Sequence, residues 1–205
     1  MAFKTYLLIV LLTVFTSREC YAQLKLPIFD VELKIEQNII PGFGGDSNGS
    51  VRLLETTNVY GGAHVQLNQH IALGGFYSRS FRGTGQLHYD NNTISKEVLF
   101  LQKGLDVRFS TSRAKKWRRF LSVNYSQIEL VQVNGSYRLA GKTNAFGVSW
   151  GIMRRLSHNL YLNVMGGGVK VMADEIFWFY SKRSGKGEVG FIADIGLTYN
   201  IGKRK

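Results

Sequence analysis

Acidic and basic side chains stand two residues apart in two segments of the sequence, where Glu32 precedes Lys34 and Asp106 precedes Arg108. An extended strand presents residues i and i+2 on the same face, so each pair would share a face. Opposite charges in a confined interior are expected to pair, because an unpaired charge is costly there. Lys170 joins this set if the glycine run before it shifts the phase of its strand by one residue. The predicted ion-pair network comprises Glu32, Lys34, Asp106, Arg108, Lys170 and Asp194.

The four histidines are the other candidates for acid–base chemistry or metal binding. His64 falls on the less apolar face of a predicted strand. His70 and His158 fall in short turns, and His88 falls in a long link. Their spacing is not that of metal ligands, and no histidine is accompanied by Ser and an acidic residue in a recognisable catalytic pattern. We therefore expect no metal, no cofactor and no catalysis, with an enzyme acting through His64 as the alternative.

The amino-terminal segment has the pattern of a secretory signal peptide. A positively charged start is followed by an apolar run over residues 6–15, and small residues precede a cleavage position at residue 23. The run is well short of the roughly 20 residues that a spanning helix needs. We assign residues 1–22 to a cleaved signal peptide and residues 23–205 to one domain. Since Cys20 is the only cysteine, the processed chain must be held together without disulfides.

Apolar and polar residues alternate through eight segments of the sequence, which predicts eight β-strands. The alternation is clearest from Val189 to Ile201, where a helix would spread the apolar residues around its circumference. In another segment the apolar phase slips between Tyr125 and Ile128, which predicts a one-residue bulge near Ser126. The predicted strands lie near residues 27–38, in two runs within 58–81, at 99–110, 117–131 and 144–154, from 160 onward, and at 189–201.

The predicted links between these strands alternate strictly between short and long. In an antiparallel up-and-down meander, this alternation places every short link at one end of the sheet and every long link at the other. The short links lie at 68–70, 111–116 and 155–159, and the long links lie at 39–57, 83–98, 132–143 and 173–187.

The two faces of the predicted strands differ in composition. One face is nearly all apolar, while the other carries Gly, Ser, Asn and charges of both signs. The second face suits the interior of an eight-stranded barrel, which is just wide enough for side chains. In a dry core each of its unpaired polar groups would cost about 1–3 kcal/mol. We therefore predict an all-β fold, an eight-stranded antiparallel up-and-down transmembrane barrel with its apolar face toward lipid. A soluble lipocalin-like ligand carrier is the alternative, although the sequence lacks an early G-x-W motif.

The hairpin N-V-Y-G-G-A-H-V-Q-L-N-Q-H-I-A-L-G-G-F-Y-S and the terminal strand G-F-I-A-D-I-G-L-T-Y-N-I-G resemble those of the small outer-membrane β-barrel superfamily of Gram-negative bacteria, which includes the porin-like and OmpX-like families. The resemblance covers residues 23–205. It implies a monomer in the outer membrane, with periplasmic short turns, four extracellular loops and insertion by the barrel-assembly machinery. One departure is that the chain continues past Tyr199 to Lys205, whereas the terminal strand of the family usually ends on an aromatic residue.

The function implied by this resemblance is structural or concerned with surface interactions, with a lumen filled by side chains. A narrow channel and an outer-membrane lipid-modifying enzyme remain the alternatives. An aromatic and basic segment in the last long link is either an outer contact surface, with lipopolysaccharide as a candidate partner, or a continuation of the seventh strand. Its residues are Phe177, Trp178, Phe179, Tyr180, Lys182 and Arg183.

The chain is strongly basic, with a formal net charge of +12. Much of this charge falls at the end of the short links, where it would attract anionic phospholipid headgroups or, alternatively, form an ordinary solvated rim. No nucleic-acid recognition motif accompanies it, so we expect no nucleic-acid partner. The basic residues at this end are Arg113, Lys115, Lys116, Arg118, Arg119, Arg154, Arg155, Lys203, Arg204 and Lys205. Aromatic residues expected to form interfacial girdles are Tyr60, Phe81, Phe109, Trp117, Phe120, Trp150, Tyr161 and Tyr199.

Overall fold

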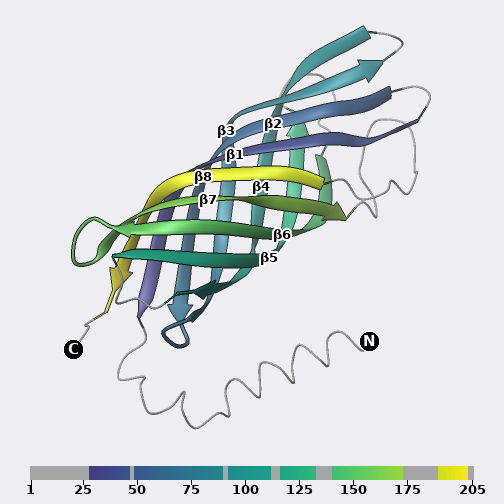
Figure 1. Ribbon diagram of the computed structural model, residues 1–205. Coiled ribbons are helices and arrows are strands. Elements are labelled where there is room, and N and C mark those ends of the chain that lie inside the picture. The colour runs from purple at the N-terminus through teal and green to yellow at the C-terminus, as the bar shows by residue number, and fades with distance from the viewer. Residues whose placement is uncertain are drawn as a thin grey trace, which may run out of the picture.

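Eight antiparallel strands form one closed β-barrel in sequence order, as Figure 1 shows. The computed structural model describes residues 28–46, 49–89, 92–111, 116–132, 140–172 and 189–202. The predicted signal peptide, residues 1–22, lies outside these ranges. The strands are β1 (Phe29–Asp46), β2 (Gly49–Gln66), β3 (Ile71–Tyr89), β4 (Asn92–Ser110), β5 (Trp117–Gln132), β6 (Ala140–Arg155), β7 (Leu160–Met172) and β8 (Val189–Ile201).

The pairing of β1 with β8 closes the sheet. Phe29 lies opposite Ile201, and the register continues without a shift to Ile39 opposite Phe191. Every strand is thus paired on both sides. A closed sheet leaves no row of unpaired backbone N–H and C=O groups, which is the condition for placing strands in hydrocarbon.

The short links fall where the sequence predicts them, at one end of the barrel, but two of the predicted long links are mostly strand. β1 runs to Asp46 and β2 begins at Gly49, so only residues 47–48 separate them. β3 and β4 are likewise separated by residues 90–91 alone. These extensions form two hairpins that project beyond the rest of the barrel (Figure 1). The turn-forming residues in 39–57 and 83–98 predict loops, but backbone pairing between strands tolerates such residues, so the strands continue through both segments.

The bulge predicted near Ser126 is wrong. The register of β5 with both β4 and β6 is continuous through Ser126. Ile128 and Leu130 keep the inward phase of the residues before them and are buried. The change from polar to apolar residues therefore reflects a change in the lumen rather than a slip in the strand. Register shifts occur instead in the pairings of β1 with β2, β2 with β3 and β3 with β4.

The lumen is divided into levels along the barrel axis. Toward the long links it holds an apolar cluster, and its middle holds polar and charged side chains. Toward the short links, a second apolar cluster of Phe120, Met153 and Tyr161 packs on one side. The apolar cluster toward the long links consists of Ile40, Leu54, Val98, Phe100, Ile128, Leu130, Ala145, Val169, Val171 and Ile192.

Inward-facing glycines allow the strands to approach one another around this crowded lumen. A Cβ atom on Gly196 would lie 2.2 Å from the carbonyl oxygen of Leu33 and 2.5 Å from the Cα atom of Lys34. Gly196 faces β1 at the closing seam, opposite Lys34. A Cβ on Gly166, which is exposed, would meet nothing nearer than 3.8 Å.

We predict that Gly196→Ala destabilises the barrel by about 1–3 kcal/mol, because the closing seam must shift to admit the methyl group. Unfolding by urea in lipid vesicles, followed by intrinsic fluorescence, would measure the loss. Gly166→Ala is the matched control and should change the free energy of unfolding by less than about 0.5 kcal/mol. Equal destabilisation by both substitutions would contradict this account of the seam.

Candidate functional site: the polar network inside the barrel

The carboxylate of Glu32 is the centre of the polar network in the lumen. Lys34, two residues along β1, places its ammonium nitrogen 3.1 Å from Glu32 Oε2 and 3.4 Å from Asp194 Oδ2 on β8. Thr198, also on β8, donates its hydroxyl to Glu32 Oε1 at 3.2 Å. The side chains of Glu32 and Lys34 are fully buried. The register explains this cluster, because Glu32 lies opposite Thr198 and Glu36 lies opposite Asp194 on the neighbouring strand.

Arg108 joins the network from the other side of the lumen. Its guanidinium makes a two-point interaction with Glu32, through Nη1 to Oε1 and through Nη2 to Oε2, the latter at 3.1 Å. Nη2 also lies 3.4 Å from Asp106 Oδ2 on the same strand. The planar guanidinium matches a carboxylate in this bidentate manner. The guanidinium also lies over the Phe120 ring, with its Cζ atom 4.7 Å from the ring centre. Because β1 and β4 are not neighbours in the sheet, this contact ties opposite walls together.

His64 contacts Asp106 through Nε2, and the hydroxyl of Ser122 donates to Asp106 Oδ2 at 2.9 Å. The three residue types of a hydrolytic triad are therefore together, but their hydrogen bonds do not run from serine to histidine to carboxylate. Ser122 is bonded to the carboxylate and not to the imidazole, so the histidine is not positioned to take the proton of the hydroxyl. His64 is completely buried. This arrangement orients side chains and does not activate a nucleophile.

A second part of the network surrounds Glu36, one step further toward the long links. Its Oε1 atom accepts hydrogen bonds from Asn38 Nδ2 at 2.9 Å, from Asn58 Nδ2 at 2.9 Å and from Ser78 Oγ at 3.0 Å. Neutral donors thus hold the carboxylate of Glu36, whereas cations hold the carboxylate of Glu32. Glu36 is absent from the network predicted from the sequence, although the same alternation that places Glu32 and Lys34 inward extends to it.

Five of the six residues predicted for the network lie in it, and the prediction for Lys170 is wrong. The pairing of β6 with β7 is continuous through the glycine run 166–168. The inward phase of β7 therefore passes through Val169 and Val171, which are buried, while Lys170 is exposed on the outer face. The other predicted site, Phe177, Trp178, Phe179, Tyr180, Lys182 and Arg183, lies outside the described residues.

Little space remains within the network. The cavity bounded by Glu36, Asp106 and Asn124, among others, has a volume of about 20 Å³, which is room for about one water molecule. Among the described residues, no group of three or more His, Cys, Asp and Glu side chains is arranged to hold a metal ion. The described interior at this level is filled by side chains, and its charged groups are paired. No helix within the described ranges is long and apolar enough to cross a membrane.

The outer face of the barrel is apolar, as the sequence predicts. Leu33 of β1, Leu105 of β4 and Phe191 of β8 are 64%, 66% and 64% exposed. The prediction of outward-facing aromatic girdles is wrong for three residues. Tyr60, Phe120 and Tyr161 have inward phase and are buried. Of the remaining predicted aromatics, the exposed ones are Phe81, Phe109, Trp117, Trp150 and Tyr199.

Fewer of the basic residues near the short links are exposed on the outer surface than the sequence predicts. Arg118 has inward phase and is buried, with its guanidinium 5.6 Å from the centre of the Tyr161 ring and 3.3 Å from Ser110 Oγ. The guanidinium carbon of Arg155 also lies near this ring, 5.8 Å from its centre. Lys116, Arg119 and Arg154 are exposed, while Arg113, Lys115, Lys203, Arg204 and Lys205 lie outside the described residues.

We predict that Glu32→Gln destabilises the barrel by about 3–5 kcal/mol, because it leaves Arg108 and Lys34 buried with too little negative charge. Urea unfolding in vesicles would measure this loss. Glu129→Gln is the matched control, since it removes a surface pair with Lys142 at 3.6 Å whose side chains are 31% and 59% exposed. Such pairs contribute about 0–1 kcal/mol. If Glu32→Gln cost no more than Glu129→Gln, the network would not hold the lumen together.

The fold is shared with solved structures of outer-membrane proteins. OprG from Pseudomonas aeruginosa matches with a TM-score of 0.61 at 8% identity, over 86% of this chain and 97% of that one. Neisserial surface protein A matches with a TM-score of 0.58 at 11% identity, over 83% and 96% of the two chains. Ail of Yersinia pestis, solved with the heparin analogue sucrose octasulfate, matches with a TM-score of 0.52 at 8% identity, over 85% and 99%. No protein-family model and no curated protein matches the sequence. The chain has the all-β, eight-stranded closed antiparallel fold of the small outer-membrane β-barrels.

Proposed function

We propose that the protein is a non-catalytic integral protein of the Gram-negative outer membrane, with the short links in the periplasm and the long links at the cell surface. In this proposal the projecting hairpins and the remaining long links meet the environment. The lumen is closed to bulk solutes. The lipids of the outer membrane, including lipopolysaccharide, are the partners of its surface, and the barrel-assembly machinery inserts it as a monomer.

The apolar outer face is the observation that carries this proposal. Exposed aliphatic and aromatic side chains occur on all eight strands, among them Val59 of β2, Tyr77 of β3, Phe146 of β6 and Val164 of β7. A soluble monomer rarely exposes an apolar patch larger than about 300–600 Å², whereas this face encircles the molecule. Acyl chains are the solvent that such a face fits, and the closed sheet satisfies the backbone without water.

The height of the apolar face supports the same conclusion. Along the outer side of β5, the polar residues Arg119 and Gln127 bound an apolar stretch eight residues apart, or about 27 Å of extended strand. On β6, Arg154 and Asn144 are ten residues apart, or about 34 Å of strand. At a strand tilt of about 40°, these lengths correspond to roughly 20–26 Å along the barrel axis, close to the apolar band of outer-membrane barrels.

The contents of the lumen favour a closed barrel over a porin. The apolar cluster around Phe100 and Ile128 lies above the ion pairs of Glu32, so an ion on the axis would meet an apolar level and then a level of paired charges. Neither level offers a hydrated path. An enzyme is not favoured either, because the Ser122 hydroxyl donates to the carboxylate of Asp106 rather than to the imidazole of His64.

Single-cysteine labelling on intact cells tests the membrane location and orientation. The chain has no cysteine other than Cys20, which lies in the predicted signal peptide. A membrane-impermeant maleimide should label Glu97→Cys, which is exposed toward the long links, and should spare Ser157→Cys in a short link until the cells are opened. Labelling of both positions in opened cells is the control for reactivity. Recovery of the protein in a detergent-free soluble fraction, or the reverse labelling pattern, would contradict the proposal.

Planar-bilayer recording tests the closed lumen. We expect no stable conductance steps from the purified protein, because the described interior holds a cavity of only about 20 Å³ at the level of the network. A large porin recorded in the same bilayers is the positive control. Reproducible single-channel steps that change in Arg108→Gln would show instead that the network lines a conduction path.

A further inference from the structure

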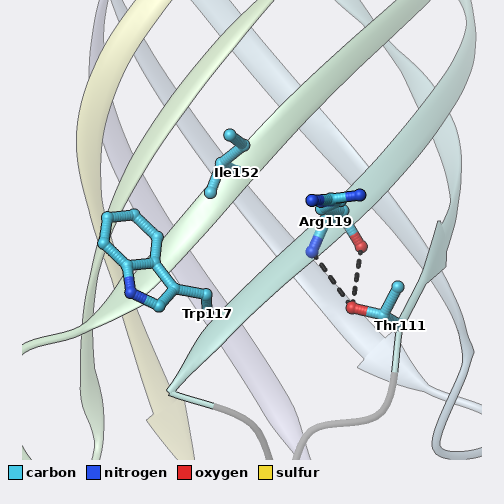
Figure 2. A pocket seen from close by; sticks show the side chains of 4 residues that line it. All are labelled: Thr111, Trp117, Arg119 and Ile152. Carbon is cyan, nitrogen blue, oxygen red and sulfur yellow. Dashed lines mark hydrogen bonds between the residues drawn. The ribbon is translucent and has the colours of Figure 1, made fainter.

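A groove lies on the outer surface of the barrel where β5 begins. It is lined by Thr111, Trp117, Arg119 and Ile152 and has a volume of about 440 Å³ (Figure 2). Sites for small molecules typically enclose about 300–1,000 Å³. The groove therefore has the size of a binding site, and its lining combines a guanidinium, a hydroxyl and apolar side chains.

The backbone of Arg119 is fixed by the end of β4. Its N–H donates to Thr111 Oγ1 at 3.0 Å, and its carbonyl accepts from the N–H of Thr111 at 2.9 Å. Figure 2 shows the Thr111 hydroxyl joined to the backbone nitrogen and the carbonyl oxygen of Arg119 on one side of the groove, with Trp117 and Ile152 on the other. Arg119 lies opposite Ile152 in the pairing of β5 with β6. The backbone that carries the Arg119 guanidinium is thus fixed at the edge of the apolar face.

A second cation lies beside the groove. Arg154 is opposite Trp117 in the same pairing, and its guanidinium carbon is 5.2 Å from the centre of the indole ring. Stacking on an aromatic face orients a guanidinium and leaves its N–H donors available. Trp117 is 54% exposed, and indole rings favour the boundary between hydrocarbon and water. Arg154 and Trp117 thus mark this boundary on the adjoining strands.

Within the described ranges, no carboxylate neutralises the charges around this groove. Neither Arg119 nor Arg154 makes an ion pair with another residue in the described ranges. The described carboxylates that point outward are Glu55, Glu97 and Glu129, and all of them belong to the half of the barrel near the long links. The groove and the Arg154 side chain beside it therefore present two cations, one hydroxyl and a hydrocarbon-facing wall, with no competing anion on the described surface.

We propose that this groove binds an anionic phospholipid of the periplasmic leaflet, with the phosphate at Arg119 and Arg154 and an acyl chain along Ile152. Guanidinium groups bind phosphate oxygens in bidentate geometry, and the apolar face continues from the groove along β5 and β6 through Leu121 and Trp150. The proposal rests on the membrane location proposed above. It adds a defined lipid site at one place on the rim.

Quenching of Trp117 by brominated lipids tests the site directly. The variant W150F/W178F leaves Trp117 as the only tryptophan. In nanodiscs of phosphatidylcholine, a small fraction of lipid brominated on its acyl chain is added as either phosphatidylglycerol or phosphatidylcholine. We expect brominated phosphatidylglycerol to quench Trp117 as effectively as roughly 25-fold more brominated phosphatidylcholine, because each of the two cations contributes a preference of about fivefold.

Charge-matched variants separate a local site from a general attraction of a basic protein. R119Q/R154Q in this background should abolish the preference for phosphatidylglycerol. K103Q/K170Q removes the same charge from exposed outer positions nearer the long links, and it should leave the preference intact. Heat-modifiable gel migration of each variant reports whether the barrel has folded, and R119K/R154K should retain part of the preference if a variant with glutamine does not fold.

The outcomes distinguish failure of the site from failure of the membrane location. Equal quenching by the two lipids, or an equal loss of preference in both double variants, would overturn the lipid site while leaving the barrel in the membrane. Absence of quenching by either lipid would mean that Trp117 does not lie against acyl chains, which would contradict the proposed function itself. A preference lost only in R119Q/R154Q supports the site.

Discussion

Closure of the sheet between β1 and β8 is the constraint on which the rest of the molecule depends. Ile39 to Phe29 pair without interruption with Phe191 to Ile201, so the chain has its first and last strands as neighbours. Once the sheet is closed, its outer face can be entirely apolar, because no backbone group of the paired strands needs water. Closure also fixes the inner diameter, and with eight strands that interior is filled by side chains.

The narrow lumen explains why the charged side chains at its centre are paired with one another. Glu32 is shared by Lys34, Arg108 and Thr198, and these contacts join β1, β4 and β8 across the interior. A buried carboxylate left alone would be costly, and so would each of its cations. Apolar clusters lie on both sides of this level along the axis. The ion pairs are therefore isolated from bulk water and act as cross-links between opposite walls of the barrel.

The outer surface is asymmetric in charge, and this asymmetry gives the barrel distinguishable ends. Exposed cations without described acidic partners lie near the short links at Arg119 and Arg154, whereas Glu129 pairs with Lys142 nearer the long links. A phospholipid leaflet and a lipopolysaccharide leaflet differ in the headgroups they present to such surfaces. The groove at Trp117 combines this local charge with the edge of the apolar outer face.

The alternation of residue types along each strand determined the all-β fold, the number of strands and the direction of Phe191, Ile195 and Leu197, because period 2 is a local property of extended backbone. It also placed Glu32, Lys34, Asp106, Arg108 and Asp194 on the inner face. Only the tertiary structure decided which of these charges meet, since Glu32 and Arg108 are far apart in sequence and on strands that do not pair. It likewise decided that β1 and β2 continue through a stretch rich in turn formers, that Ile128 stays inside, and that Lys170 stays outside. Each of those outcomes depends on the pairing of neighbouring strands and on what already fills the lumen at that level, and neither is encoded in the residues of a single strand.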